Sequence, residues 1–366
     1  MPEKGFAAVL TAPHTFEVRE FALPEIADNA GLLKLEACGI CGADIHGSER
    51  LQNNRPKILG HENVGIIAKV GTEAARKWDV KEGDRVCLEE YVPCGVCKYC
   101  RTGDFRFCPQ TDAATAKGQR LWYGSTPVDV WPALWGGYSE YMYLHPDAVL
   151  HKIPTHIPAA HAAAFLPFSN GVEWAYEYGR IGLGEAILVQ GPGQQGLACV
   201  LAAKAAGAKP IIVSGLSRDG KRLEVAKKLG ADYVIDVEKE DLVSRVKDIT
   251  GGEGVNVVVN VTGGGKTTVA ESIEVAGQRC NIVLAAPGDE TINVNSLGRR
   301  RIALIRANGH GYNAVELAIQ FIASGNLPME EIATHTYPMS RAAEAIDAVA
   351  GRGAPGAIHV SILPQV

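Results

Sequence analysis

The stretch Ala186-Ile187-Leu188-Val189-Gln190-Gly191-Pro192-Gly193-Gln194-Gln195-Gly196 joins a short apolar run to a glycine-rich loop. An apolar run of this length predicts a buried strand, and the alanine-rich residues 197–206 that follow predict a helix ended by Gly207. Between a strand and a helix, a Gly-x-Gly-x-x-Gly pattern lets the backbone approach a pyrophosphate at the positive helix N-terminus. The stretch therefore predicts a dinucleotide-binding βαβ unit.

The residues after this loop continue the alternation of short apolar runs and helical segments. Strands are expected at 211–213, 233–235, 255–261 and 281–285, and helices at 223–229 and 241–249. Strands that alternate with helices indicate a parallel, doubly wound α/β sheet.

The end of the second strand bears on which nicotinamide cofactor is bound. An NAD site has Asp or Glu about 20 residues after the loop to hold the ribose hydroxyls, but Gly215 stands there and is followed by Ser217, Arg218 and Lys221. A small residue followed by a hydroxyl and basic groups suits a 2′-phosphate, so NADP is favoured over NAD. The alternative is that these groups are solvated charges and that Asp219 folds back to an NAD ribose. The expected cofactor-binding residues are Gly191, Gly193, Gln194, Gln195, Gly196, Gly215, Ser217, Arg218 and Lys221.

A second cluster lies in the first half of the chain, where Cys94, Cys97, Cys100 and Cys108 fall close together with Gly95 and Gly103 among them. Four thiolates at this spacing predict a closed, tetrahedral, structural zinc site, and the alternative is four unligated thiols.

Composition limits the remaining possibilities. A length of 366 residues suggests about two domains. A net charge of −5 argues against a general nucleic-acid surface. Gln190, Gln194 and Gln195 with their neighbouring glycines exclude a membrane span in the uncharged stretch Ala186 to Ala203. The N-terminus shows no signal-peptide pattern, so a cytoplasmic location is expected, and nine cysteines then indicate metal ligands or free thiols.

Residues 1 to about 150 consist of short runs interrupted by Gly and Pro, which predicts a mainly β region. The tail beyond about residue 310 shows helical stretches at 314–323 and 341–350 and a strand at 357–363. Because the tail is too short to fold alone, we expect it to rejoin the first half of the chain.

Taken together, these motifs resemble the zinc-containing medium-chain alcohol and polyol dehydrogenases along essentially the whole chain. The segments that carry the resemblance are Gly39-Ile40-Cys41-Gly42-Ala43-Asp44-Ile45-His46, Gly60-His61-Glu62, Gly83-Asp84-Arg85-Val86, the four cysteines, Gly136-Gly137-Tyr138-Ser139-Glu140-Tyr141 and the glycine loop. The resemblance implies a GroES-like β domain built from residues 1–165 and 309–366, with the zinc lobe at about 93–109. It also implies a Rossmann domain at 166–308 and a homo-oligomer, either a dimer or a tetramer.

In this family the counterparts of Cys41 and His61 bind a catalytic zinc ion, so two zinc ions per chain are implied. The counterpart of Glu62 lies beside that metal, Asp44 matches a carboxylate that orients a ligating imidazole, and His46 matches a position that passes protons to solvent. A surface histidine without such a role is the alternative for His46.

The chain departs from the family pattern at two positions. Ala43 replaces the usual Ser or Thr, and Leu166 stands where a third metal ligand is usual. Either Glu62 completes a Cys–His–carboxylate set, which is sound zinc chemistry, or the catalytic zinc is weak or absent.

Three functions remain after these departures. The leading one is a zinc-dependent alcohol dehydrogenase or carbonyl reductase that transfers a hydride between NAD(P) and a small alcohol, ketone or aldehyde. The second is a zinc-independent reductase of a conjugated carbonyl, supported by Leu166 and Ala43. The third, of another class, is a catalytically silent dinucleotide-binding protein.

Overall fold

The computed structural model describes residues 2–51, 54–112, 115–116, 120–263, 265, 267–285 and 289–365. The chain divides into two compact units: Met1–Leu166 with Gly311–Val366, and Pro167–His310. None of the described helices combines the length and the apolar character that a membrane crossing requires.

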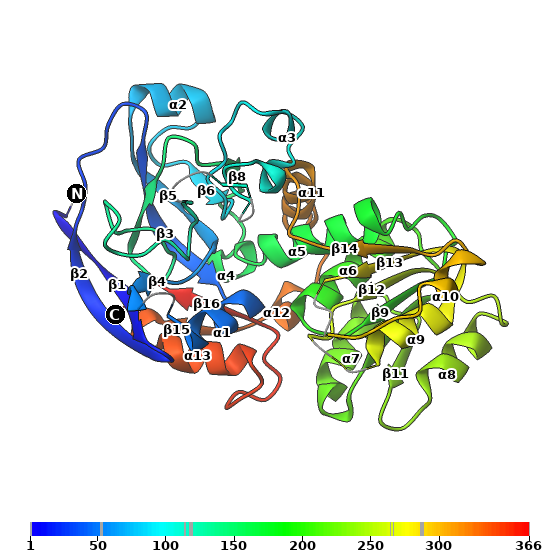
Figure 1. The fold of residues 1–366 in the computed structure, drawn as a ribbon. Helices are drawn as coiled ribbons and strands as arrows, with labels where there is room; N and C mark the ends of the chain where they lie inside the picture. Colours follow the sequence, from blue (N-terminus) through cyan, green and yellow to red (C-terminus); the bar gives the residue numbers. More distant parts are fainter. Residues whose placement is uncertain are drawn as a thin grey trace. The chain divides into compact units, whose positions relative to one another are not determined.

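The unit Pro167–His310 is built on a parallel sheet in which the strand order is β11-β10-β9-β12-β13-β14 (Figure 1). This order reverses beside β9, and in such sheets ligands bind where the order reverses, at the carboxyl ends of the strands. The predicted doubly wound parallel sheet is therefore confirmed. The strands are β9 (Ile187–Gln190), β10 (Ile211–Gly215), β11 (Tyr233–Asp236), β12 (Val255–Asn260), β13 (Ala276–Leu284) and β14 (Ala303–Arg306).

Burial explains why this sheet forms. The β9 strand is buried along its whole length and pairs with β10 on one side and β12 on the other, as a central parallel strand requires. The helix after β9 begins at Gln194 rather than at residue 197, because Gly193 already has the extended conformation of an N-cap. The helical segments are α5 (Phe165–Gly171), a π-helix (Val172–Tyr178), α6 (Gln194–Ala205), α7 (Gly220–Leu229), α8 (Leu242–Ile249), α9 (Thr268–Val275) and α10 (Asn295–Gly298).

The other unit contains a larger sheet of order β15-β16-β3-β5-β6-β8, with β7 also paired to β3, and a smaller sheet of order β2-β1-β4. The C-terminal β16 pairs antiparallel with β3, with Ser361 opposite Gly39, so the tail rejoins the first half as expected. The strands are β1 (Lys4–Ala12), β2 (Thr15–Ala22), β3 (Gly31–Gly39), β4 (Lys57–Ile58), β5 (Glu62–Val70), β6 (Arg85–Leu88), β7 (Tyr141–Leu144), β8 (Leu150–Lys152), β15 (Ala333–Pro338) and β16 (His359–Leu363).

The core of this unit contains Leu33, Val86, Trp135, Met142 and Ile346, all buried. Its helices are α1 (Gly42–Glu49), α2 (Thr72–Trp78), α3 (Lys98–Arg101), α4 (Ala159–Ala162), α11 (Tyr312–Ala323), α12 (Met329–Ile332) and α13 (Ala342–Val349).

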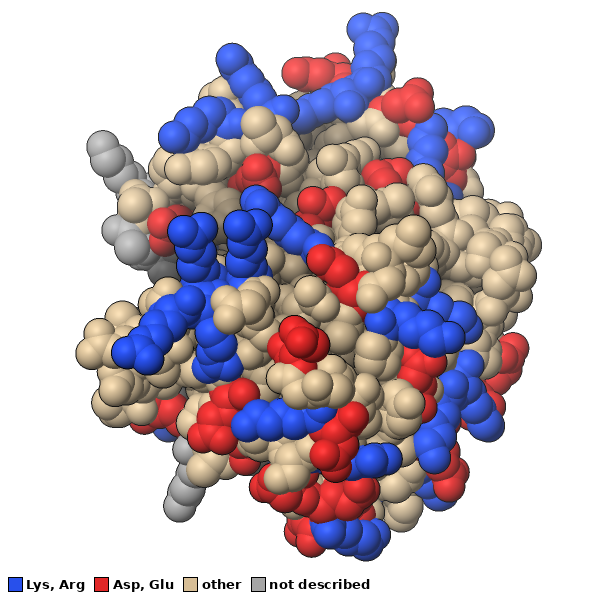
Figure 2. Space-filling model, turned by 90° about the vertical axis from the view of Figure 1, so that its right-hand side faces the viewer, with Lys and Arg blue, Asp and Glu red and all other residues tan. Residues whose placement is uncertain are grey.

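On the molecular face drawn in Figure 2, basic and acidic side chains are interspersed.

Candidate active site and metal centres

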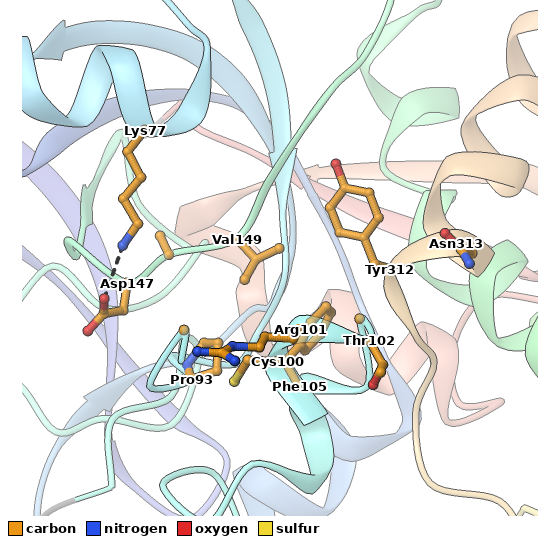
Figure 3. A pocket seen from close by; sticks show the side chains of 13 residues that line it. Lys77, Pro93, Cys100, Arg101, Thr102, Phe105, Asp147, Val149, Tyr312 and Asn313 are labelled. Carbon is orange, nitrogen blue, oxygen red and sulfur yellow. Dashed lines mark hydrogen bonds and ion pairs between the residues drawn. The ribbon is translucent and has the colours of Figure 1, made fainter. Parts of the chain in front are cut away.

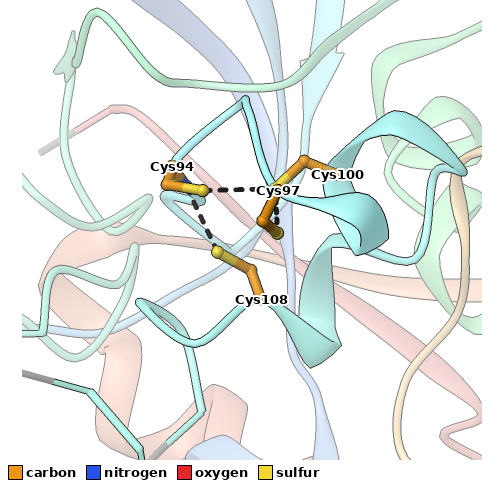
Figure 4. Close-up of side chains that lie close together, drawn as sticks. All are labelled: Cys94, Cys97, Cys100 and Cys108. Atoms are coloured by element: carbon orange, nitrogen blue, oxygen red, sulfur yellow. Dashed lines mark hydrogen bonds between the residues drawn. The ribbon is translucent and has the colours of Figure 1, made fainter.

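The four cysteines of the predicted zinc lobe converge in the structure (Figure 4). Cys97 Sγ lies 3.5 Å and Cys94 Sγ 3.9 Å from Cys100 Sγ, and the four sulfur atoms all lie within 4.8 Å of one another. Two thiolates on one tetrahedral zinc, at a Zn–S distance near 2.3 Å, are separated by about 3.8 Å. A disulfide would require about 2.05 Å. The arrangement therefore fits a zinc ion at its centre.

Local backbone geometry explains why the lobe curls around this centre. Gly95 and Gly103 adopt positive φ values of +73° and +82°, which other residues rarely accept. Backbone N–H groups of Cys94 and Gln110 donate to Cys108 Sγ at 3.3 and 3.4 Å. Backbone N–H groups, first that of Val96, also lower the pKa of Cys94 to about 7. These donors stabilise thiolate sulfur, the form that binds metal.

A pocket of about 420 Å³ lies against this lobe and is lined by Cys100, Arg101, Lys77, Asp147 and Tyr312 among others (Figure 3). Its Lys77 ammonium donates to Asp147 at 3.1 Å and to the Pro146 carbonyl at 2.6 Å. Lys77 is therefore already paired, whereas Arg101 and Cys100 also line the pocket.

Cys41, His61 and Glu62 form the second cluster, with ligand atoms within 4.8 Å of one another. Cys41 is the N-cap of α1, Glu62 is the first residue of β5, and His61 directly precedes it. All three are buried, with exposed fractions of 8%, 7% and 0%. The Oε2 atom of Glu62 accepts a hydrogen bond from His359. Its Oε1 atom is also buried and has no hydrogen-bond partner in the described part of the chain.

Asp44 lies directly behind this cluster. Its Oδ2 accepts the backbone N–H of Cys41 at 2.9 Å, and its Oδ1 accepts that of Gly60 at 3.4 Å. The same Oδ1 is 3.7 Å from His61 Nδ1, an electrostatic contact that is too long for a hydrogen bond. Asp44 therefore fixes the turn that carries Cys41 and faces Nδ1 of His61, which leaves Nε2 of that ring for a metal.

The electrostatics of the cluster favour a cation. Burial alone lowers the pKa of His61, but the carboxylates of Asp44 and Glu90 and the thiol of Cys41 outweigh it and raise the pKa well above its usual range. Burial, opposed by His61, raises the pKa of Cys41. Burying several acidic groups together is costly. A divalent ion among Cys41, His61 and Glu62 would offset this cost, and thiolate, imidazole and carboxylate are ordinary zinc ligands. These residues therefore fit the metal that the sequence implies.

The structure does not bring every predicted residue into this cluster. The side chain of His46 is 84% exposed and pairs with Glu49 at 3.4 Å. Leu166 is buried and offers only hydrocarbon, and Ala43 offers only a methyl group.

Two residues that the sequence reasoning did not single out stand beside the metal cluster. Glu90 Oε2 lies 3.5 Å from His61 Nε2, and His359 Nε2 lies 3.1 Å from Glu62 Oε2. Glu90 could have been found from the sequence, because two acidic residues, Glu89 and Glu90, directly follow an apolar run. His359 could not, because it is a single histidine in the last strand and no motif surrounds it.

In the unit Pro167–His310, the glycine loop follows β9 and opens α6 as predicted. Gly191 has a φ of +101°, and a Cβ on Gly196 would lie 1.9 Å from the Gly191 carbonyl oxygen. A Cβ on Gly193 would meet nothing within 4 Å. The first and third glycines therefore serve the turn and its packing against the helix, whereas the second leaves room for a ligand.

A pocket of about 290 Å³ adjoins this loop, and Gly191, Gly193, Gly215 and Arg218 are among the residues that line it. The predicted Gln194, Gln195 and Gly196 form the first turn of α6, and Lys221 is exposed on α7. Ser217 is engaged elsewhere, since its hydroxyl donates to Asp236 at 2.8 Å and its N–H to Glu238 at 2.7 Å. The pocket also includes Asp219 and Arg222, which pair at 3.4 Å.

Comparison with known proteins identifies both parts of the chain. Residues 27–155 match the alcohol dehydrogenase GroES-like domain, and residues 196–324 match the zinc-binding dehydrogenase family. A solved oxidoreductase of unknown specificity from Escherichia coli is similar with a TM-score of 0.84 at 27% identity, covering 98% of this chain and 99% of its own.

Curated relatives extend over the full length. A probable alcohol dehydrogenase of Mycobacterium tuberculosis is 34% identical, with 98% of each chain covered. The erythritol/L-threitol dehydrogenase of Mycolicibacterium smegmatis is 31% identical and covers 100% of this chain and 99% of its own. Together with the geometry above, these matches show that the chain belongs to the zinc-containing medium-chain alcohol and polyol dehydrogenases.

Proposed function

We propose that this chain is a zinc-dependent dehydrogenase that interconverts small alcohols and their ketones or aldehydes, with NADP favoured over NAD. The observation that carries the proposal is the buried Oε1 of Glu62, which has no hydrogen-bond partner among the described residues and lies beside Cys41 and His61. A buried carboxylate oxygen that the protein leaves unpaired is expected to have another partner. A zinc ion held by these three residues supplies that partner.

The chain's own residues prepare this site for the reaction. Cys41, His61 and Glu62 would hold the catalytic zinc, and Asp44 fixes the turn that carries Cys41. A zinc ion so held would supply a Lewis acid for an alcohol oxygen, and a bound nicotinamide would accept the hydride. His46, on α1 and largely exposed, is suited to exchange protons with water.

The buried cluster of Cys41, His61 and Glu62 also argues against the two alternative functions. A metal-free reductase would leave Cys41, Glu62 and Asp44 buried around one histidine with no compensating ion, which is energetically unfavourable. A silent dinucleotide-binding protein would need neither that cluster nor its supporting contacts.

The preference for NADP depends on Arg218, one of the residues that line the pocket beside the glycine loop. Gly215 is weaker support, because a Cβ there would come within 2.9 Å of the Pro192 ring and packing alone requires glycine. The first turn of α6, with Gln194, Gln195 and Gly196, would present backbone N–H groups to the pyrophosphate. Ser217 and Lys221 would act only at the rim, because Ser217 is hydrogen-bonded to Asp236 and Glu238 and Lys221 is exposed on α7.

The relatives guide the choice of substrates. One is named for erythritol and L-threitol, so we propose polyols together with simple alcohols as the class to test. We also propose a second, structural zinc on Cys94, Cys97, Cys100 and Cys108, a dimer or tetramer, and a cytoplasmic location.

Metal analysis combined with turnover tests the proposal. Wild type, Cys41→Ser, Glu62→Gln and Cys97→Ser would be analysed for zinc and assayed with NADP and NAD on an alcohol panel that includes erythritol. We expect two zinc ions in wild type, and one zinc with little turnover in Cys41→Ser and Glu62→Gln. One zinc in wild type with turnover that survives Cys41→Ser would establish the metal-free reductase. Cofactor binding without turnover on the panel would favour the silent protein.

A further inference from the structure

Glu90 stands on the metal side of His61. It follows the end of β6, and its Oε2 lies 3.5 Å from His61 Nε2, whereas Asp44 faces Nδ1 on the other side of the ring. The Glu90 carboxylate is thus next to the one imidazole nitrogen that can bind a metal.

The distance between these atoms is informative. Hydrogen bonds between nitrogen and a carboxylate oxygen are usually 2.7–3.2 Å long, and a charged pair free to close would be expected in that range. Two ligands of one tetrahedral zinc, with Zn–N and Zn–O distances near 2.1 Å, are about 3.4 Å apart. The observed 3.5 Å matches the separation of two ligands better than that of a hydrogen bond.

The protein also holds Glu90 in place. Its carbonyl accepts the N–H of Tyr123 at 2.9 Å, and the next residue, Tyr91, is buried and forms an isolated β-bridge with Trp122. The preceding Glu89 is fully buried against His151, with Oε1 and Nε2 3.4 Å apart. A carboxylate on so well anchored a turn points in a defined direction.

We propose that Glu90 is a fourth protein ligand of the catalytic zinc, in a chain whose Leu166 cannot contribute one. The inference rests on the proposed function only in requiring that Cys41, His61 and Glu62 hold that metal. The Glu90 side chain is 16% exposed, against 9% for that of His61, and the whole residues Cys41, His61 and Glu62 are only 8%, 7% and 0% exposed. Glu90 is therefore the ligand that can give up its position when a substrate enters.

The test measures metal binding directly in the full-length protein. Zinc affinity would be determined by competition with a chelator, and Co²⁺ would be substituted for zinc to record its d–d absorption, which reports the ligand set. Glu90→Gln keeps the size of the side chain and removes its charge. Glu82→Gln, at an exposed position in the turn before β6, is the matched control.

We expect Glu90→Gln to weaken the binding of one zinc tenfold or more, to change the Co²⁺ spectrum, and to leave the second zinc and the melting temperature of the metal-free protein as in Glu82→Gln. Unchanged affinity together with an unchanged spectrum would overturn the assignment. Cys41→Ser, measured in parallel, separates the two proposals. If Cys41→Ser loses a zinc and Glu90→Gln does not, only the Glu90 assignment fails. If Cys41→Ser retains every zinc found in wild type, the catalytic metal itself is refuted.

Discussion

The Nε2 atom of His359 donates a hydrogen bond of 3.1 Å to Oε2 of Glu62, across 297 positions of sequence. Both side chains are fully buried. The contact exists because β16 pairs with β3 and brings the last strand beside the start of β5. One oxygen of Glu62 is thereby fixed, and the other is left for a metal. The C-terminal strand thus positions a candidate ligand from the first part of the chain.

Replacing His359 should weaken the catalytic zinc without removing a ligand. In His359→Leu the Glu62 carboxylate loses its donor, and loss of such an orienting partner typically costs 10–100-fold in metal affinity. His359→Gln retains a side-chain N–H donor and should lose less. Chelator competition measures both variants, and equal zinc affinities in wild type, His359→Leu and His359→Gln would show that this hydrogen bond does not support the metal.

Gly39, at the end of β3, offers a steric test of the same pair. A Cβ at this position would lie 2.1 Å from Glu62 Oε2 and 2.6 Å from His359 Nε2. Gly39→Ala should therefore displace the Glu62 carboxylate and lose the catalytic zinc, while the lobe zinc stays. Gly42→Ala, where a Cβ meets nothing within 4 Å, is the control. Zinc content per chain distinguishes the two variants, and retention of both ions in Gly39→Ala would contradict the expected displacement.

The sequence predicts those parts of the sites whose residues lie close together along the chain. The glycine loop and the four cysteines are continuous motifs, and both were found at the predicted places. Glu90 and His359 were missed because their roles arise from strand pairing and packing between distant segments.

The secondary structure also departs from the prediction where the surrounding fold, rather than the local sequence, decides it. The β14 strand was not predicted, since as an edge strand it has exposed residues at both ends and shows no apolar alternation. Glu173 carries a charged side chain in a helical segment and yet is only 6% exposed. It lies in a π-helix, whose wider turn shifts the faces expected from α-helical periodicity.

The zinc lobe should contribute to stability rather than to chemistry. Cys100→Ser should remove one zinc ion and lower the melting temperature by roughly 5–10 °C, which corresponds to about 2–3 kcal/mol for a unit of this size. Cys199→Ala, at a buried cysteine in α6, should keep both ions. Calorimetry with metal analysis decides the matter, and an unchanged zinc content in Cys100→Ser would refute the lobe assignment.

Arg218 should determine the choice of cofactor. In Arg218→Ala the kcat/KM for NADP should fall about 10–100-fold, the usual cost of losing a hydrogen bond between charged groups, while the kcat/KM for NAD changes little. Lys227→Ala removes an exposed charge further along α7 and controls for net charge. Steady-state kinetics with both cofactors provide the comparison. An equal loss with NAD and NADP, or a wild-type preference for NAD, would refute the assignment.

Replacing Gly196 by alanine should lower stability, whereas replacing Gly193 by alanine should lower cofactor affinity. A Cβ on Gly196 would lie 1.9 Å from the Gly191 carbonyl oxygen, so Gly196→Ala should destabilise the unit Pro167–His310 itself. Around Gly193 a Cβ meets nothing within 4 Å and the backbone is extended, so Gly193→Ala should fold with a wild-type melting temperature.

The added methyl group of Gly193→Ala would nevertheless occupy the space through which the backbone must approach a pyrophosphate, so cofactor affinity should fall tenfold or more. Gly220→Ala, equally open but at the start of α7, should keep both stability and affinity. Thermal melts and fluorescence titration with NADPH measure the two properties separately. If Gly193→Ala binds NADPH as tightly as Gly220→Ala does, the open space at this loop is not where the pyrophosphate lies.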